Sequence, residues 1–234
     1  YSLYLLIKNK PIWAGLFIAL SIAVKLIPLI FLPLFYQWFI KKENSVKHGI
    51  INLIAFYIFI IGIVILLFSP FYSSELIANY SDSVGLWFKN FEFNASFYYI
   101  FREIGYLFRG YNEIAIIGKI IPILTIVFIG YITFFRKNTT PKELITGFLF
   151  ALSFYYFTTT TMHPWYLATL ILLAVFTNYK FPITWSLVII LSYAAYANDT
   201  YKENLFLISL EYLIVYGYLI WELFFKNKSK LNSQ

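Results

Sequence analysis

A histidine with aromatic neighbours interrupts an otherwise apolar sequence in the stretch TTTTMHPWYLATL, residues 158 to 170. The charge of His163 can change near neutral pH, so its side chain can contact an anionic or hydroxyl-rich substrate in a cavity. Trp165 and Tyr166 follow it directly. The structural alternative is that both rings anchor a helix at a membrane surface and that His163 is a satisfied turn residue. The spacing alone leaves both interpretations open.

Two further ionisable residues lie inside apolar runs. Lys25 precedes Pro28, and Glu211 lies about two turns inside the last apolar segment. A charge at bilayer depth costs at least about 2.5 to 3.5 kcal/mol, so it is normally paired or faces a cavity. Lys25 could meet a phosphate or extend to the surface, and Glu211 could face a cavity or join helices by an ion pair. Glu222 can pair with Lys226, four residues further on.

The composition indicates what kind of protein must position these residues. Of the 234 residues, 61% are hydrophobic, 23% aromatic and only 12% charged, which is more apolar surface than one soluble core buries. An integral membrane protein is therefore expected. The excess of seven positive charges lies at the ends of apolar runs and not in a stripe, so it indicates membrane topology and argues against nucleic-acid binding.

Signatures of familiar soluble enzymes do not occur in the sequence. It contains no GxGxxG, Walker, HExxH or GxSxG pattern, no cysteine and only two histidines. Disulfides and thiol-ligated metals are thereby excluded, and a histidine-based metal site has almost no support. We expect no cofactor and no metal site.

Apolar runs long enough to cross about 30 Å of hydrocarbon predict six full transmembrane helices. They cover residues 48–69, 113–135, 143–162, 164–179, 181–197 and 204–225. A seventh stretch, 11–39, predicts a pair of short helices broken near Lys25 to Pro28, with a single kinked span as the alternative. The predicted fold class is all-α, a polytopic helical bundle forming one transmembrane domain over 1–234. Because the sequence opens like the tail of a helix, we expect it to be the C-terminal part of a longer protein.

Lysine and arginine positions orient this bundle. If the C-terminal tail with Lys226, Lys228 and Lys230 is cytoplasmic, ten basic residues near span ends fall inside and four fall in outer segments. The outward segments are then 70–112, the turn around His163 and the loop 198–204. The first of them is expected to form an outer-face loop with an interfacial helix.

That interfacial helix is predicted from residue types within 70–112. Asn94 can cap a helix that runs to about Phe108, on which Arg102, Tyr106 and Arg109 share one face. The remaining face is Phe and Tyr, a pattern typical of a helix lying in the membrane interface.

Several short motifs together resemble polytopic GT-C glycosyltransferases that use polyprenyl-phosphate sugars. GLFIALSIAVKLIPLIFLPLF at 15–35 is similar to their helix rich in small residues, followed by Lys-x-x-Pro and an apolar helix. FNAS at 93–96, HPWYL at 163–167 and an LSY…LEY pattern over 191–212 occur in the same order. Within the superfamily the chain resembles the polyprenol-phosphate-mannose-dependent, PIG-M-like and family-87-like group.

The resemblance implies transfer of a sugar, with mannose favoured, from a polyprenyl phosphate to a glycan or glycolipid acceptor on the outer face. It implies that His163, Trp165 and Tyr166 line the sugar site, and that Lys25, or alternatively the two arginines, meets the lipid phosphate. The candidate substrate-binding residues are His163, Trp165, Tyr166, Asn94, Ser96, Lys25, Arg102, Arg109 and Glu211.

The carboxylate that accepts the acceptor's proton is expected upstream of this chain, because in the superfamily it lies in the first outer loop. Transfer also needs positive charge to stabilise the departing phosphate. Asp82, Asp199 and Glu203 are outward carboxylates that could substitute, although each is typical of a solvated loop residue.

A transporter or flippase of a lipid-linked or polar substrate is the rival interpretation. It would also carry Lys25, Glu211 and a broken hairpin, but it should show internal repeats, and the sequence shows no convincing one. The short loops and the lack of a retention signal favour a bacterial inner membrane with a cytoplasmic C-terminus.

Overall fold

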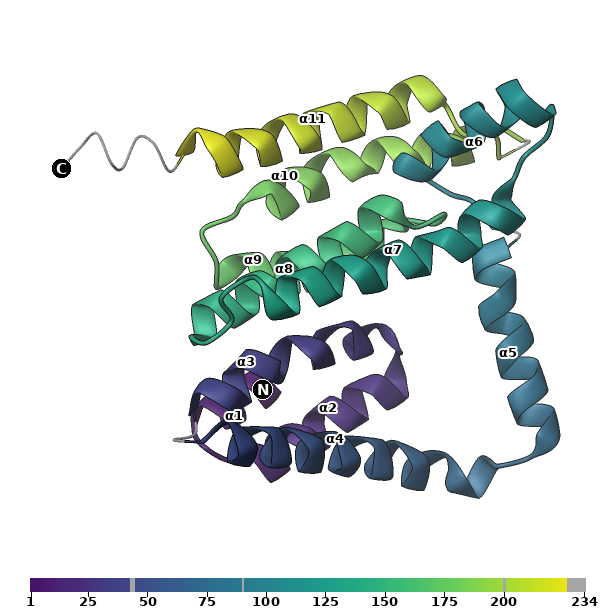
Figure 1. Cartoon of the computed structure of the whole chain (residues 1–234). Coiled ribbons are helices and arrows are strands. Elements are labelled where there is room, and N and C mark those ends of the chain that lie inside the picture. The colour runs from purple at the N-terminus through teal and green to yellow at the C-terminus, as the bar shows by residue number, and fades with distance from the viewer. Residues whose placement is uncertain (43–44, 90, 200, 227–234) are drawn as a thin grey trace. The chain divides into compact units, whose positions relative to one another are not determined.

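The described part of the chain is built from helices joined by short turns (Figure 1). This computed structural model describes residues 1–42, 45–89, 91–199 and 201–226. Those ranges contain no strand, only an isolated parallel β-bridge between Phe93 and Thr161. The predicted all-α class is confirmed. Lys228 and Lys230, which the predicted topology uses, lie outside the described residues.

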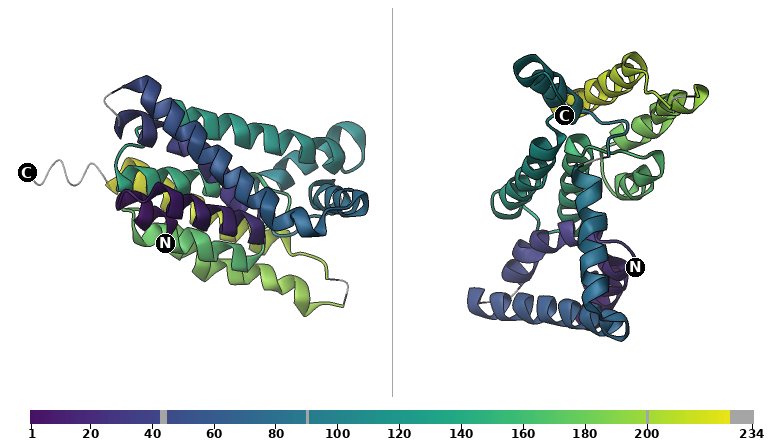
Figure 2. Two further views of the ribbon diagram at one scale, coloured as in Figure 1. Left: turned by 90° about the horizontal axis from the view of Figure 1, so that it is seen from below. Right: turned by 90° about the vertical axis from the view of Figure 1, so that its right-hand side faces the viewer.

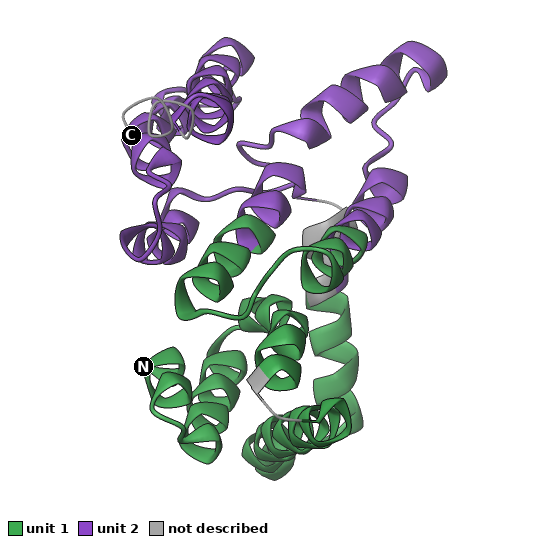
Figure 3. Ribbon diagram, turned by 60° about the vertical axis from the view of Figure 1, so that its left-hand side comes forward, with its two compact units in different colours: residues 1–84, 126–151 green, residues 85–125, 152–234 purple. Residues whose placement is uncertain are grey.

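The chain divides into two compact units (Figure 3). Unit 1 comprises residues 1–84 and 126–151, and unit 2 comprises residues 85–125 and 152–234. Helices α7 (Ile114–Phe134) and α8 (Pro141–Thr158) each contribute to both units. The prediction of one transmembrane domain over 1–234 stays a prediction.

Unit 1 contains the N-terminal helices. Its elements are α1 (Ser2–Ile7), α2 (Pro11–Val24), η1 (Ile27–Leu34), α3 (Phe35–Lys42), α4 (Val46–Phe68), η2 (Ser69–Phe71) and most of α5 (Ser74–Lys89). The predicted break near Lys25 to Pro28 is present, because α2 ends at Val24 and Lys25 has extended backbone angles (φ −156°, ψ 133°). Pro28 then occupies the first turn of η1, where its missing N–H leaves no partner unsatisfied.

Close packing holds these helices together. A Cβ atom on Gly49 of α4 would lie 2.7 Å from the Cα of Ile40, so only glycine permits this approach of α3 and α4. The ring of Phe35 contacts the rings of Phe56, at 5.7 Å between centroids, and Phe148, at 5.4 Å. Nε2 of Gln37 donates to the carbonyl oxygens of Thr133 and Arg136, which ties α3 to the C-terminal end of α7 within unit 1.

Unit 2 contains residues 85–125 and the C-terminal helices. Its elements are α6 (Phe97–Arg109), the first half of α7, the end of α8, η3 (Pro164–Tyr166), α9 (Leu167–Val175), α10 (Phe181–Val188), η4 (Ile189–Ala197) and α11 (Leu205–Phe224). Helices α10 and α11 pack side by side, which can be followed in Figures 1 and 2. The indole of Trp185 on α10 is fully buried, 4.7 Å from the ring of Phe157 and 5.8 Å from that of Tyr212.

All six predicted spans coincide with helical segments. Three of them, Val46–Phe71, Ile114–Phe134 and Leu205–Phe224, are long and apolar enough to cross a membrane. Two others, Pro164–Val175 and Phe181–Ala197, are shorter apolar helices, and the remaining one corresponds to α8. These helices are consistent with an integral membrane protein.

The outer segment contains more helix than the sequence indicates. A helix, α6, is present where the interfacial helix was predicted, and its place at a membrane interface stays a prediction. Helix α5 precedes it and was not predicted. The prediction that Asn94 caps α6 is wrong. The helix begins at Phe97 with Ser96 in the N-cap position, because the side chain of Asn94 bonds instead to Glu211.

Candidate functional site

A short non-helical segment, Phe91–Ser96, lies at the centre of the candidate site in unit 2. The N–H of Phe93 donates to the carbonyl of Thr160 at 3.1 Å, and the N–H of Met162 donates to the carbonyl of Phe93 at 2.8 Å. The hydroxyl of Thr161 donates to the carbonyl of Phe91 at 3.1 Å. These bonds attach the outer segment to the turn that carries His163.

Three rings form an aromatic stack on this segment: Phe93, His163 and Trp165. The imidazole lies 4.4 Å from the indole of Trp165, with 9° between the planes, and 5.1 Å from the ring of Phe93, with 28° between the planes. His163 is therefore covered on both ring faces, and 8% of the residue is exposed. Trp165 is 59% exposed, so a ligand can stack on this indole while meeting only the edge of the imidazole.

The turn around His163 lies between the ends of two helical segments. Helix α8 ends at Thr158, and Pro164 is the first residue of η3. The N–H at this position has no partner within the helix, so proline is tolerated there. The ring of Tyr166 is perpendicular to His163 at 5.4 Å and stacks on Tyr156 at 5.8 Å. Tyr166 thus supports the stack from one side.

Asn94 connects this segment to three side chains, one in the loop before α11 and two on α11. Its backbone N–H donates to Oε1 of Glu203 at 2.6 Å, its carbonyl accepts from the hydroxyl of Tyr212 at 2.7 Å, and its Nδ2 donates to Oε1 of Glu211 at 3.2 Å. Asn94 is fully buried and has a φ of 46°, in the left-handed region that a non-glycine residue seldom adopts. Contacts from α11 and the preceding loop therefore hold one residue in a disfavoured conformation.

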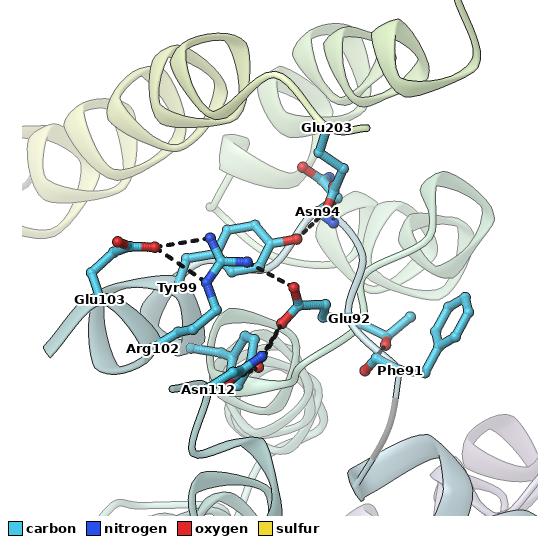
Figure 4. A network of polar contacts seen from close by, with 10 residues as sticks. Phe91, Glu92, Asn94, Tyr99, Arg102, Glu103, Asn112 and Glu203 are labelled. Carbon is cyan, nitrogen blue, oxygen red and sulfur yellow. Dashed lines mark hydrogen bonds and ion pairs between the residues drawn. The ribbon is translucent and has the colours of Figure 1, made fainter. Parts of the chain in front are cut away.

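A polar network extends from Asn94 along α6 (Figure 4). The hydroxyl of Tyr99 donates to Oε2 of Glu203. The guanidinium of Arg102 lies 4.3 Å from the centre of the Tyr99 ring and pairs with Glu92 at 2.7 Å and with Glu103 at 2.9 Å. Arg102 is thus already neutralised by carboxylates of the protein.

The environment of this network shifts the pKa of its titratable groups. Burial raises the pKa of the Glu203 carboxyl above its usual value, although the hydrogen bonds from Tyr99 and Asn94 act in the opposite direction. Burial and the charge of Glu203 raise the pKa of the Tyr99 phenol. Burial disfavours the charge of Arg102, but the hydrogen bond to Glu103 and the charge of Glu92 outweigh it and raise the pKa of the guanidinium. A carboxyl shifted by burial in a polar cluster is a functional-site candidate.

Glu211 lies beneath this network and is fully buried on α11. Its Oε1 accepts from Nε1 of Trp185 at 2.9 Å and from Nδ2 of Asn94 at 3.2 Å. Within the described part of the chain, Oε2 has no hydrogen-bond partner and the carboxylate has no ion-pair partner. Glu211 therefore acts on the site through Asn94.

The other predicted site residues are distributed more widely. The hydroxyl of Ser96 shares a hydrogen bond of 2.6 Å with the hydroxyl of Tyr216. Arg109 is exposed at the end of α6, 3.3 Å from a carboxylate oxygen of Glu113. Lys25 is exposed in unit 1.

The two weak catalytic candidates, Asp82 and Asp199, are both exposed. Asp82 lies on α5 in unit 1, and Asp199 lies in the loop after η4. Neither takes part in the hydrogen bonds around Asn94 among the described residues.

Sequence reasoning missed Glu92 and Tyr99. It named Glu203 among the carboxylates that could replace the catalytic one, although such a residue is more typical of a solvated loop. Glu92 accepts from the hydroxyl of Tyr98 at 2.6 Å and from Nδ2 of Asn112 at 3.1 Å, besides pairing with Arg102. The one local signal for Glu92 is its position as a lone charge in the aromatic run FEFN. Among the described residues, no three His, Cys, Asp or Glu side chains form a group that could hold a metal.

The fold and the site define a helical membrane protein with a polar and aromatic site around Phe93, Asn94 and His163. Residues 1–152 match the family model of glycosyltransferase family 87, and the chain belongs to this family. It is a membrane glycosyltransferase, which acts on a sugar donor and an acceptor. The matched part includes Lys25 and Asn94 and ends before His163. Comparison with curated proteins and with solved structures gives no match.

Proposed function

We propose that this protein transfers a sugar, with mannose as the first candidate, from a polyprenyl-phosphate donor to a glycan or glycolipid acceptor at the outer face of the membrane. Family membership supports sugar transfer. The choice of donor and sugar rests on the resemblance of the HPWYL and FNAS motifs to transferases of that kind.

The observation that carries the proposal is the aromatic stack. An exposed indole face is suited to the C–H face of a pyranose, and the edge of the neighbouring imidazole can bond to a hydroxyl or a phosphate oxygen. The β-bridge between Phe93 and Thr161 holds the stack in place before any ligand arrives. Such pre-organisation lowers the entropic penalty of binding.

The lipid phosphate needs a cation that it can reach from solvent or from the membrane surface. Arg102 is paired with two carboxylates, and only 12% of its side chain is exposed. Arg109, which pairs with Glu113, and Lys25 are both exposed. We therefore assign the phosphate to Arg109 or Lys25 and give Arg102 a structural role within the polar network.

The proposed membrane is a bacterial inner membrane, with the C-terminus cytoplasmic and the aromatic stack on the outer side. The distribution of lysine and arginine between the two sides supports this orientation. The donor is then used on the face opposite to the cytoplasm, where a lipid-linked sugar can replace a nucleotide sugar.

The test is sugar transfer in membranes that contain the protein, supplied with radiolabelled polyprenyl-phosphate mannose and a mixed acceptor extract. His163→Ala and Trp165→Ala are compared with Trp13→Ala, a matched control in which an indole of similar exposure, 57%, is removed from α2. We expect at least a tenfold loss of transfer in the first two variants and wild-type transfer in the control.

Folding is checked by the Tm of each purified variant. A loss of transfer that accompanies a loss of folded protein would return His163 and Trp165 to a structural role. Failure of the wild type to transfer mannose, glucose or arabinose, with movement of the lipid still detectable, would contradict the proposal and favour the transporter.

A further inference from the structure

The loop between η4 and α11 carries a carboxylate that the proposed function does not use and that is bonded to the residue next to the aromatic stack. Glu203 contacts Asn94, and Asn94 directly follows Phe93, the ring that stacks on His163. We propose that Glu203 binds a hydroxyl group of the sugar substrate and that Asn94 is the residue that positions it. This inference rests on the proposed function and adds a second contact to the same site.

The carboxylate of Glu203 is held at both oxygens and still has bonding capacity. Oε1 accepts from the N–H of Asn94 at 2.6 Å and Oε2 accepts from the hydroxyl of Tyr99. A carboxylate has about four acceptor positions, so each oxygen can accept one more hydrogen bond. Glu203 is half-buried, which leaves it accessible to a ligand.

The charges around Glu203 favour a hydroxyl as its ligand. Glu203 has no ion-pair partner in the described part of the chain, and Arg102, whose charge acts on it, is paired with Glu92 and Glu103. A phosphate would be repelled by this negative group, whereas a sugar hydroxyl donates to a carboxylate in a strong, charge-assisted hydrogen bond. The hydroxyl can come from the sugar of the donor or from the sugar of the acceptor.

The backbone of Asn94 explains how Glu203 keeps its place. A left-handed conformation at a non-glycine residue costs about 1 to 3 kcal/mol and persists only where the surroundings impose it. Here Tyr212 fixes the carbonyl, Glu211 fixes the side chain, and the N–H is left to point at Glu203. Strain of this kind is concentrated at ligand-binding positions, where it pre-organises the site.

The experiment measures the KM for donor and for acceptor in Glu203→Gln, with Glu75→Gln as a control that changes an exposed glutamate on α5. Loss of a charge-assisted hydrogen bond predicts a rise of about tenfold in the KM of one substrate, with kcat changed less than threefold. A rise in the donor KM identifies the donor's sugar as the ligand, and a rise in the acceptor KM identifies the acceptor's. Both KM values within twofold of wild type would overturn the inference.

The role of Asn94 is tested by a matched pair. Asn94→Gly and Asn94→Ala both remove the bond to Glu211, but only glycine adopts a positive φ without penalty. We expect Asn94→Ala to raise the same KM as Glu203→Gln, and Asn94→Gly to raise it by a factor at least threefold smaller. Equal KM values for the two variants would contradict a positioning role, and this pair also decides the question if Glu203→Gln does not fold.

A binding measurement separates this inference from the proposed function. The affinity of a fluorescent mannose oligosaccharide is measured for wild type and Glu203→Gln in lipid nanodiscs. A wild type that transfers no sugar contradicts the proposed function, and the inference is then decided by binding alone. Weaker binding by Glu203→Gln supports it, and equal binding overturns it.

Discussion

Two buried carboxylates on α11 have opposite surroundings, although both residues are almost completely shielded. Glu222 accepts hydrogen bonds from the backbone N–H groups of Lys180 and Phe181 and pairs with Lys226 at 2.5 Å. Glu211, eleven residues or about 16 Å earlier on the helix, has two side-chain donors on one oxygen and no cation among the described residues.

The difference shows which carboxylate stabilises the fold and which serves the site. Glu222 satisfies the free N–H groups at the start of α10 and has its charge balanced, which is what a structural carboxylate requires. Glu211 is less completely satisfied and orients the strained residue Asn94. A buried acid whose bonds are incomplete is more typical of a functional site than of a helix cap.

The largest expected effect is on stability at Glu222. Glu222→Ala leaves the N–H groups of Lys180 and Phe181 without their acceptor and removes the carboxylate that pairs with Lys226. We expect a loss of about 3 kcal/mol in the free energy of unfolding, since buried donors and charges lose their partners. In a chain of this size that corresponds to a fall of about 6 to 12 °C in the Tm, measured by thermal unfolding in detergent. An unchanged Tm would contradict a structural role for Glu222.

Glu211 should show a smaller loss of stability and a larger loss of transfer. Glu211→Leu removes the acceptor for Trp185 and Asn94, with an expected loss of about 2 kcal/mol and at least a tenfold loss of transfer. Glu211→Gln keeps an acceptor oxygen, so both its Tm and its transfer should approach wild type. A Gln variant that folds but transfers as poorly as the Leu variant would mean that the ligand needs the charge itself.

The smallest effect concerns the pH dependence of Glu203, which Tyr99, Glu92 and Arg102 surround. Since burial raises its pKa, the carboxylate is lost at a higher pH than an exposed glutamate would be, and the KM it controls should rise as the pH falls through that value. Glu203→Gln should show no such step. A wild-type KM that is independent of pH through this range contradicts the assignment.

The same shift has an opposite consequence for stability. The folded state binds the proton of Glu203 more tightly than the unfolded chain does. This stabilisation is therefore fully present below the unfolded pKa and is lost as the pH rises through the folded pKa. The Tm of wild type relative to Glu203→Gln should accordingly decrease as the pH rises through that range.

Much of the fold was accessible from local features of the sequence. Apolar segments of membrane-spanning length predicted the helical class, and Lys25 to Pro28 predicted the break after α2. Glu222 and Lys226 were predicted to pair from their spacing of four residues, and the structure confirms it. Each feature depends on backbone sterics or on helix geometry over a few residues, so position along the chain is sufficient.

The site depended on contacts that no local pattern specifies. Asn94 meets Glu203 across 109 positions and Glu211 across 117, and this tertiary bonding overrode its preference for capping α6. The polar loop around Glu203 is typical of solvated residues. In the structure, however, its carboxylate accepts a hydrogen bond from the hydroxyl of Tyr99. The sequence by itself determined a membrane protein of broken and continuous helices, because bilayer thickness and proline sterics act locally. Only the tertiary structure decided that Glu222 has all its hydrogen-bond and charge partners and that Glu211 orients Asn94 in the site. Those bonds depend on donors from segments distant in the sequence.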